Sequence, residues 1–525
     1  MAKQVHYEIF GRRGNSPGWS LLEAQDRRDE ALEFAKQALG RGFSGVKVVK
    51  ETYDDATGDF MGLTIFEDGT RKVKLRREAE DSPPTLPCRT PEDLYSVHAR
   101  VTLGRLFADT LARWKLTVTE LIHRADMLEK LEATGTLFQH AVQKVALAQA
   151  GDTGDSVVTL IRALNDLADR AIQRVYREEA GKRVVACANA EELAAFAMAK
   201  AGQPEASFLV GMALAKYLAP ATNWNDKLDR ALEVLEALPP DGPARAMLSA
   251  LADAVVSEIL GGSAALQQLI GPLPDLGNAL LAMSDLYIAR LPPGAVNASL
   301  MRLSAMFGKD RLLDARTALG RRVLAELKTH KRLGATVEIE MRHLRAITSR
   351  LVLGPSRLVP HEDIVGAVTL RSRHLVQSAP IEEFLKDTPQ PTERILRLLA
   401  LEENIVGAEN KRRIWDNIKP ILASAAFEAT LGDGAASPLV RLARAAELQT
   451  RIMKSGLPEV ARHEGGALVD ALARKSIEPG RFAAVLAKGG GVIQTMQTAL
   501  DSGHIPKGAC DTLLRELLKK VARAA

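Results

Sequence analysis

Cysteine is scarce in this sequence of 525 residues. Only three are present, Cys88, Cys187 and Cys510, and they lie far apart, without a C-x-x-C pair. This excludes the disulfide framework that stabilises small secreted domains. We expect three ordinary reduced thiols.

Long hydrophobic runs are also missing. The stretch "ASFLVGMALAKYLAPAT" at 206–222 contains Lys216 and Pro220, and it falls short of the roughly 18 to 20 apolar residues that a membrane-spanning helix needs. The first residues, "MAKQVHYEIFGRRG", lack the apolar run of a secretory signal. We therefore predict no transmembrane segment and a cytoplasmic location.

No strong excess of one charge exists over the whole chain. There are 70 basic and 65 acidic residues, a formal net charge of +5, which is too small to imply a polyanionic partner by itself. Hydrophobic residues make up 46% and charged residues 26%, which excludes a mainly disordered chain. The composition indicates a globular protein of roughly two to four domains.

Aromatic residues are few and unevenly distributed. Eight of the 23 lie in residues 1–78, so the physical character of the chain changes after this region. The stretch "EDSPPTLPCRTPED" follows and contains four prolines, which lack the backbone donors that sheets and helix interiors need. The predicted domains are a small α+β domain at 1–78, a proline-rich linker at 79–92 and an all-helical region at 93–525, with two possible subdomains at about 93–300 and 301–525.

The region before the linker predicts a small ββαββ domain. "VHYEIF" alternates with period two, "GRRGNSPG" is typical of a turn, and "WSLLEA" predicts the returning strand. Asp26 is a candidate N-cap for a helix that ends at Gly40, and further strand patterns occupy 45–53, 59–69 and 71–76. One helix covers only one face of such a sheet, so the other face is solvated or available to a partner.

After the linker, helical patterns continue to the C-terminus. Thr90 is a candidate N-cap with Pro91 in the first turn, and Thr117 with Glu120 forms a capping box. The predicted fold class is therefore mainly α, with the small α+β domain followed by a large helical bundle or an irregular α-solenoid. We find no fixed repeat of about 30 to 45 residues that would decide between these two arrangements.

The stretch "LEENIVGAENKRRIWDNI" at 401–418 is dense in charged residues, asparagines and a tryptophan. Apolar residues at helical spacing flank it on both sides, so we interpret it as a solvated connection between two helices. The alternative is a partner-binding corner, in which charged side chains meet a partner and a tryptophan anchors the edge. Its candidate residues are Glu403, Arg412, Arg413 and Trp415.

Residues 301–357 carry the main charge asymmetry of the chain. They hold thirteen lysines and arginines against five acids, a local charge of +8. A solvated basic helix face is the simplest interpretation, and an acidic protein partner or a nucleic acid are the alternatives. The candidate ridge residues are Arg311, Arg316, Arg321, Arg322, Lys328, Lys331 and Arg332.

Catalytic motifs are nearly absent. "GNSPG" at 14–18 matches the pattern of a hydrolase nucleophile elbow, but Pro17 has no N–H to donate to an oxyanion. His361-Glu362 and His463-Glu464 lack the second histidine of a zinc protease helix, and "KGGGVIQ" at 488–494 lacks the strand and the Lys-Ser/Thr of a nucleotide loop. We therefore predict no catalytic residue, no metal site and no cofactor.

The leading hypothesis is a non-enzymatic cytoplasmic adaptor or regulatory protein that acts through protein–protein interaction, with the open sheet face and the basic ridge as docking surfaces. The first alternative is a nucleic-acid-binding protein that uses the basic segment at 302–357. The second is an enzyme whose site is assembled in a cleft of the helical region from residues distant in sequence. The partner and the oligomeric state stay open.

Overall fold

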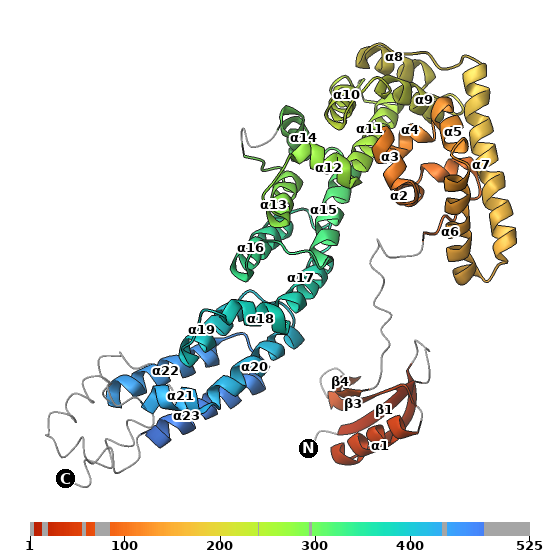
Figure 1. The fold of residues 1–525 in the computed structure, drawn as a ribbon. Coiled ribbons are helices and arrows are strands. Elements are labelled where there is room, and N and C mark those ends of the chain that lie inside the picture. The colour runs from red at the N-terminus through yellow and green to blue at the C-terminus, as the bar shows by residue number, and fades with distance from the viewer. Residues whose placement is uncertain are drawn as a thin grey trace, which may run out of the picture. The chain divides into compact units, whose positions relative to one another are not determined.

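The protein consists of two compact units, Met1–Pro83 and Pro84–Ala525, as seen in a computed structural model (Figure 1). The structure describes residues 5–12, 19–41, 43–54, 59–68, 84–239, 241–292, 297–432 and 438–476. The "GNSPG" turn, the strand pattern at 71–76, Cys510 and the glycine run at 488–494 lie outside the described residues.

Unit 1 contains a four-stranded antiparallel sheet and one helix, which confirms the predicted ββαββ order. The strand order in the sheet is β2-β1-β3-β4. Its elements are β1 (Val5–Arg12), β2 (Ser20–Gln25), α1 (Arg28–Gly40), β3 (Gly45–Asp54) and β4 (Asp59–Asp68).

Helix α1 covers one face of this sheet. Its buried residues are all alanines, Ala31, Ala35 and Ala38, and these small side chains let the helix lie close to Ile9 and Val46 of the central strands. The helix includes Gly40, which was predicted as the stop just after it, and Arg41 is its C-cap; the predicted N-cap Asp26 is wrong by one residue. Arg27 occupies the N-cap position, with no side-chain cap.

All regular secondary structure in the described residues of unit 2 is helical, which confirms the mainly α fold class. Its elements are the 3-10 helix η1 (Pro91–Tyr95) and the α-helices α2 (Val97–Leu106), α3 (Ala108–Trp114), α4 (Val118–Leu121), α5 (Ala125–Glu132), α6 (Thr136–Thr153), α7 (Val157–Ala180), α8 (Ala190–Lys200), α9 (Ala206–Leu218), α10 (Trp224–Glu236), α11 (Pro243–Gly261), α12 (Ser263–Ile270), α13 (Leu276–Tyr287), α14 (Ala298–Gly308), α15 (Leu313–Lys328), α16 (Val337–Leu353), α17 (His361–Leu375), α18 (Ser378–Leu385), α19 (Pro391–Glu402), α20 (Ala408–Leu422), α21 (Ala425–Gly432), α22 (Pro438–Lys454) and α23 (Glu459–Ser476).

The first helices of unit 2 are shorter than their sequence patterns suggest. The predicted cap Thr90 and its Pro91 start the 3-10 helix η1, and Ser96 then caps a separate helix, α2, by accepting from the backbone N–H of Ala99. The predicted capping box of Thr117 and Glu120 is present, but it starts the four-residue helix α4. Short helices place several helix ends in the interior, where their free backbone groups need partners.

From α13 onward, the helices of unit 2 pack against others that are close in sequence, and neighbouring helices in this part of Figure 1 therefore have similar colours. The long apolar helix α11 contacts α15, α10, α8 and α4, and α15 in turn contacts α13 and α17. Further along, α19 packs on α20 and α22 on α23. The contacts from α13 onward are of the kind that an irregular solenoid has, in which each element contacts its neighbours, whereas α11 also contacts α2 and α4 near the start of the unit.

None of the described helices is by itself long and apolar enough to span a membrane. Helices α11 and α12 pass such a test together by length and composition, but they are bent by 86° at the break between them. The apolar residues of α11, among them Leu248, Val255 and Ile259, are buried within unit 2.

One close approach inside unit 2 requires a glycine. His123 is almost completely buried, and its ring lies directly against α9 at Gly211. A Cβ at position 211 would lie 2.4 Å from Nε2 of His123, which is less than any van der Waals contact allows. Gly104 of α2 is different, because a Cβ there would meet only Cγ2 of Val118 at 3.6 Å.

This difference predicts opposite effects for two glycine-to-alanine substitutions. Gly211→Ala should lower the free energy of unfolding by about 1 to 3 kcal/mol, because the added methyl group displaces the His123 ring. Gly104→Ala should be neutral or stabilise by up to about 1 kcal/mol, because alanine favours a helix interior and has room there. Urea denaturation of both variants checks this, and an equal effect of the two would show that the ring does not need the space at Gly211.

Candidate functional site

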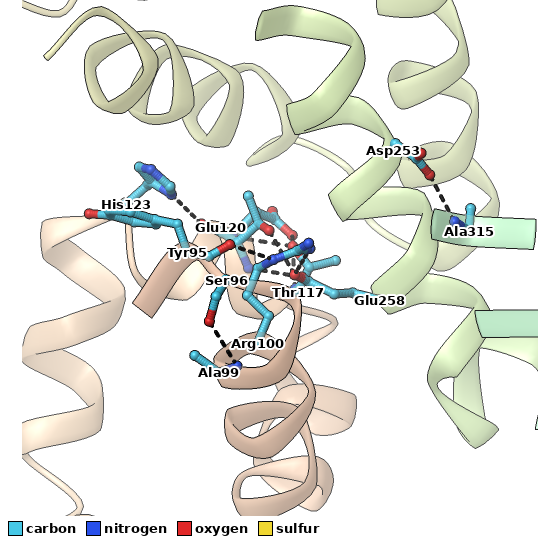
Figure 2. A network of polar contacts seen from close by, with 11 residues as sticks. Tyr95, Ser96, Ala99, Arg100, Thr117, Glu120, His123, Asp253, Glu258 and Ala315 are labelled. Carbon is cyan, nitrogen blue, oxygen red and sulfur yellow. Dashed lines mark hydrogen bonds and ion pairs between the residues drawn. The ribbon is translucent and has the colours of Figure 1, made fainter. Parts of the chain in front are cut away.

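Two acidic side chains of α11 reach the ends of other helices. Asp253 accepts hydrogen bonds from the backbone N–H groups of Asp314 and Ala315 at 3.0 and 2.8 Å, in the first turn of α15. Five residues later, Glu258 accepts from the backbone N–H of Thr119 at 2.8 Å, in the first turn of α4. Figure 2 shows the contact of Asp253 with Ala315, and Glu258 beside Arg100. Because the first N–H groups of a helix have no partner within it, these carboxylates complete two helix starts.

Glu258 also forms the centre of a polar network. Its Oε1 accepts from Nη1 of Arg100 at 3.0 Å and from the hydroxyl of Thr119 at 2.7 Å, while Nε of Arg100 donates to the carbonyl of Tyr95 at 3.2 Å. The side chains of Arg100 and Glu258 are only 9% and 11% exposed. Burial raises the pKa of Glu258, and the charge of Arg100 opposes this shift. The pair is therefore satisfied on both sides, as a buried ion pair must be.

A second buried ion pair also involves α4. Nζ of Lys227 lies 2.7 and 2.6 Å from the two carboxylate oxygens of Glu120, and it also donates to the carbonyl of Lys115 at the end of α3. The carboxylate of Glu120 closes the capping box with Thr117 as well. Burial lowers the pKa of Lys227, and the charge of Glu120 opposes the shift. Glu120 thus joins α4 to α10.

His123 lies next to these pairs within a group of rings. Its Nδ1 donates to the carbonyl of Thr119 at 2.7 Å, and its ring stacks on Tyr95 with centroids 5.1 Å apart. Phe208 lies 5.4 Å away, and the guanidinium of Arg174 lies 4.1 Å over the Phe208 ring. Burial lowers the pKa of His123 to about 4, and the positive charge of Arg174 adds to this. His123 is therefore neutral near pH 7.

These groups resemble a catalytic cluster in composition but not in their contacts. The two carboxylates of α11, Glu120, Lys227 and Arg100 are bonded to helix ends or to one another. Among the described residues, no group of three or more histidines, cysteines or acids could hold a metal ion. The arrangement can fix the positions of α4, α10, α11 and α15, and its chemistry is that of structural ion pairs.

Tyr95 also lines a cavity of about 110 Å³. Its walls come from η1 and from helices α2 and α4–α7, and all but two of its lining residues are apolar. The exceptions are Tyr95 and Glu132. Burial raises the pKa of Tyr95 to about 12, so its hydroxyl stays protonated. The cavity therefore suits an apolar molecule better than a charged one.

The seven predicted ridge residues fall into different environments. Arg316 is 6% exposed and points inward: it donates to the carbonyl of Tyr287 at 2.7 Å and of Phe307 at 3.2 Å, near the ends of α13 and α14. It is thus part of the interior and not of an exposed ridge. Of the others, Arg321 is exposed and Arg311 is half-buried, with Nη1 of Arg311 4.0 Å from the sulfur of Met306.

Ion pairs offset part of the ridge charge. Arg322 pairs with Glu326 at 2.5 Å, Lys331 lies 3.8 Å from the same carboxylate, and Arg332 bridges Glu340 and Glu383. For Arg321 and Lys328 the structure gives no hydrogen bond or ion pair to a described residue. Elsewhere in the segment, Asp229, Glu236 and Asp285 of other helices pair with Arg302 and Arg350. Counting charges along the sequence therefore overstates the positive field of this region.

The stretch at 401–418 is a helix–helix connection, with α19 ending at Glu402 and α20 beginning at Ala408. Trp415 does not form an exposed edge: it is 5% exposed, and its Nε1 donates to Glu464 of α23 at 3.2 Å. Arg412 is exposed, and Arg413 lies 3.9 Å from Glu409. The structure therefore does not bring the four predicted corner residues together on one surface.

Glu403 belongs to a different feature, a polar cavity of about 490 Å³ between α19, α20 and α22. Glu402, which is 1% exposed, pairs there with Lys411 and accepts from the backbone N–H of Gly456 at 3.1 Å. Arg451 pairs with Glu447 on the same helix. The charges of this cavity thus largely neutralise one another, and they select no single ligand charge.

Sequence reasoning missed the ion pairs around α4, although one signal was available. Asp253 and Glu258 are the only acids in the largely apolar helix α11. Because most of this helix is apolar and is expected to be buried, its acids need buried bonding partners. The sequence does not reveal those partners, because they are distant in sequence: Arg100 lies 158 residues from Glu258, and Lys227 lies 107 residues from Glu120.

His123 predicts a pH dependence of stability. Its pKa is about 4 in the folded protein, against an ordinary value of about 6.5 for histidine, so the unfolded chain takes up the proton first as the pH falls. Its contribution is fully present above about pH 6.5 and is lost toward pH 4. The difference in unfolding free energy between the wild type and His123→Gln should shrink by about 3 kcal/mol over this range.

Urea titrations of the full chain at several pH values measure this difference. The comparison with His123→Gln is needed because another group titrates in the same range. Burial raises the pKa of Asp253 to about 6, which changes the stability with the opposite sign in an overlapping pH range. Substitution of His123 leaves the Asp253 contribution in both proteins. A difference that stays constant between pH 7 and pH 4 would contradict the neutral, buried state of His123.

Comparison with known proteins adds no assignment: no family model matches the chain, and no curated protein and no solved structure is similar to it.

Proposed function

We propose that the protein is a non-enzymatic cytoplasmic adaptor, and that it binds a protein partner through the face of the unit 1 sheet that α1 leaves uncovered. One observation carries this proposal: aromatic, aliphatic and cationic side chains gather at one end of that face. Phe10 of β1 and Lys47 of β3 are directly opposite in the ladder, while their neighbours Ile9 and Val46 point toward α1 and are completely buried.

The cations of this face lie over its aromatic rings. Nζ of Lys47 is 4.8 Å from the centroid of Phe10 and 5.4 Å from that of Trp19, and the guanidinium of Arg12 is 4.8 Å from Trp19. Arg12 can lie there because β3 begins with Gly45, where a Cβ would be 2.6 Å from Nε of Arg12. Cation–π contacts of this kind hold the rings and charges in place before a partner arrives.

Leu21 indicates a protein partner rather than a nucleic acid. It pairs with Phe10 across β1 and β2, and it is 55% exposed, so an aliphatic group adjoins the rings. Aromatic residues and arginine are the groups that protein interfaces concentrate at their centres. We expect the partner to supply an apolar side chain for Phe10 and Leu21 and carboxylates for Arg12 and Lys47.

Unit 2 supports this function as a scaffold. Its helices are joined by buried ion pairs and helix-end contacts, such as those of Glu258 and Arg316, and a succession of packed helices presents a long surface for further partners. The ridge residues Arg321 and Lys328 can contribute a second, weaker contact there.

A photo-crosslinking amino acid at position 21 of the full chain tests the proposal in the native host. We expect covalent adducts with one or a few proteins, and we expect their yield to fall at least about tenfold in Phe10→Ser and in Lys47→Glu, as for the loss of a central contact. Mass spectrometry of the adducts measures both the identity and the yield.

Lys36→Glu is the matched control, because Lys36 is exposed on α1 and its reversal changes the net charge of unit 1 by the same amount. It should leave the yield unchanged. Equal losses in Lys36→Glu and Lys47→Glu, or no protein adduct at all, would contradict the proposal. Adducts with RNA or DNA would favour the nucleic-acid alternative.

A further inference from the structure

The cavity beside Tyr95 lies where two apolar clusters of unit 2 meet. Leu94, Val142 and Leu164 come from the smaller cluster, and Leu121 and Leu128 come from the main core. All of them line the same space. Protein interiors normally fill such junctions with side chains, so a cavity of about 110 Å³ is a departure from close packing.

A strap formed by residues 84–95 provides one wall of the cavity. Leu86, Leu94 and Tyr95 of the strap all line it, and Leu86 is 7% exposed. The strap is attached to α2 and α7 by side chains that donate to its carbonyls: Nε2 of His98 to Thr85 at 2.9 Å, and Nη2 of Arg170 to Arg89 at 2.8 Å. Thr102 also donates to the carbonyl of Thr85 at 3.3 Å, Arg100 to that of Tyr95 at 3.2 Å, and Arg174 to the carboxylate of Glu92 at 2.7 Å. All of these bonds are made by side chains, so the strap can move away without unfolding α2 or α7, which gives a ligand a route of entry.

We propose that this cavity is a binding site for a small uncharged apolar molecule, about the size of one aromatic ring or a short alkyl chain. An apolar cavity of similar size, about 150 Å³, stays dry and binds benzene in another protein. The single charged lining residue is Glu132, which is exposed and accepts from the hydroxyl of Tyr176 at 3.3 Å. A negatively charged ligand would meet this carboxylate and no cation of the lining, so the site discriminates against anions.

Occupation of the site stabilises the strap. A ligand that contacts Leu86 and Leu94 gains dispersion contacts only while the strap is closed, so binding shifts the strap toward its closed state. The strap also leads directly into the residues that connect unit 1 with unit 2. The ligand would therefore act on residues 84–95 of unit 2, independently of the docking face of unit 1.

Calorimetric titration of the full chain with benzene, and separately with hexanoate, tests the site. We expect saturable binding of benzene and binding of hexanoate that is at least about tenfold weaker, because its carboxylate cannot be buried without a partner. We also expect benzene to slow hydrogen exchange in residues 84–95. Absence of benzene binding, or tighter binding of hexanoate, would overturn the proposal.

Two variants place the binding within the cavity. Ala171→Leu on α7 and Ala141→Leu on α6 add side-chain carbons to two lining positions, and each should weaken benzene binding by about tenfold or more. Ala163→Leu is the matched control, since Ala163 is exposed on α7 and does not line the cavity. Circular dichroism verifies that the variants are folded.

Benzene binding that is unchanged in both cavity variants would overturn the proposal, and so would equal loss in Ala163→Leu. Should both variants unfold, the comparison of benzene with hexanoate and the exchange rates of 84–95 in the wild type decide by themselves. Failure here would leave the crosslinking result at Leu21 unaffected, because the two sites lie in different units.

Discussion

A charged side chain is costly to bury unless another group compensates its charge and bonds its polar atoms. Helix ends have the complementary problem, because their first N–H groups and last carbonyls lack partners within the helix. In unit 2 the buried charged side chains bond the unpaired helix ends. Asp253 and Glu258 of α11 bond the starts of α15 and α4, and Arg316 of α15 bonds carbonyls of α13 and α14.

Arg371 of α17 continues this series. It is 1% exposed and donates to the carbonyls of Leu327, Lys331 and Glu326 at 2.8, 2.7 and 3.1 Å, where α15 ends. Burial lowers the pKa of Arg371, and the acids Glu340 and Glu326 oppose the shift. Neighbouring helices of unit 2 are thus joined by polar contacts of defined direction. Apolar packing alone would allow one helix to shift along its neighbour.

These contacts also limit where a functional site can lie. Charged residues that would suggest chemistry by type, such as Glu120, Lys227 and Arg316, are occupied by helix ends or by each other. The two features of the described residues that we propose as binding sites are of another kind. They are the aromatic and cationic end of the unit 1 sheet and the apolar cavity beside Tyr95, and both suit binding rather than turnover.

Local patterns in the sequence predicted local structure well. The ββαββ order, the mainly α body and the capping box of Thr117 with Glu120 follow from spacings of a few residues. The ion pair of Glu120 with Lys227 could not be predicted, because the two lie 107 residues apart and many other lysines fit the same rule. Arg316 was expected at a surface, and Trp415 only in the alternative of a partner-binding corner; both are buried, since a residue type does not say which side of a helix will be covered.

The central claim is that buried charges at helix ends hold the helices of unit 2 in register. Hydrogen exchange in α15 and α17 tests it most directly, with Arg371→Met compared with Arg373→Met, an exposed position on the same helix. The account predicts that Arg371→Met lowers the local opening free energy of both helices by about 3 kcal/mol, because three carbonyls lose their donor, while Arg373→Met changes it by less than about 0.5 kcal/mol. Similar, small effects of the two substitutions would contradict it.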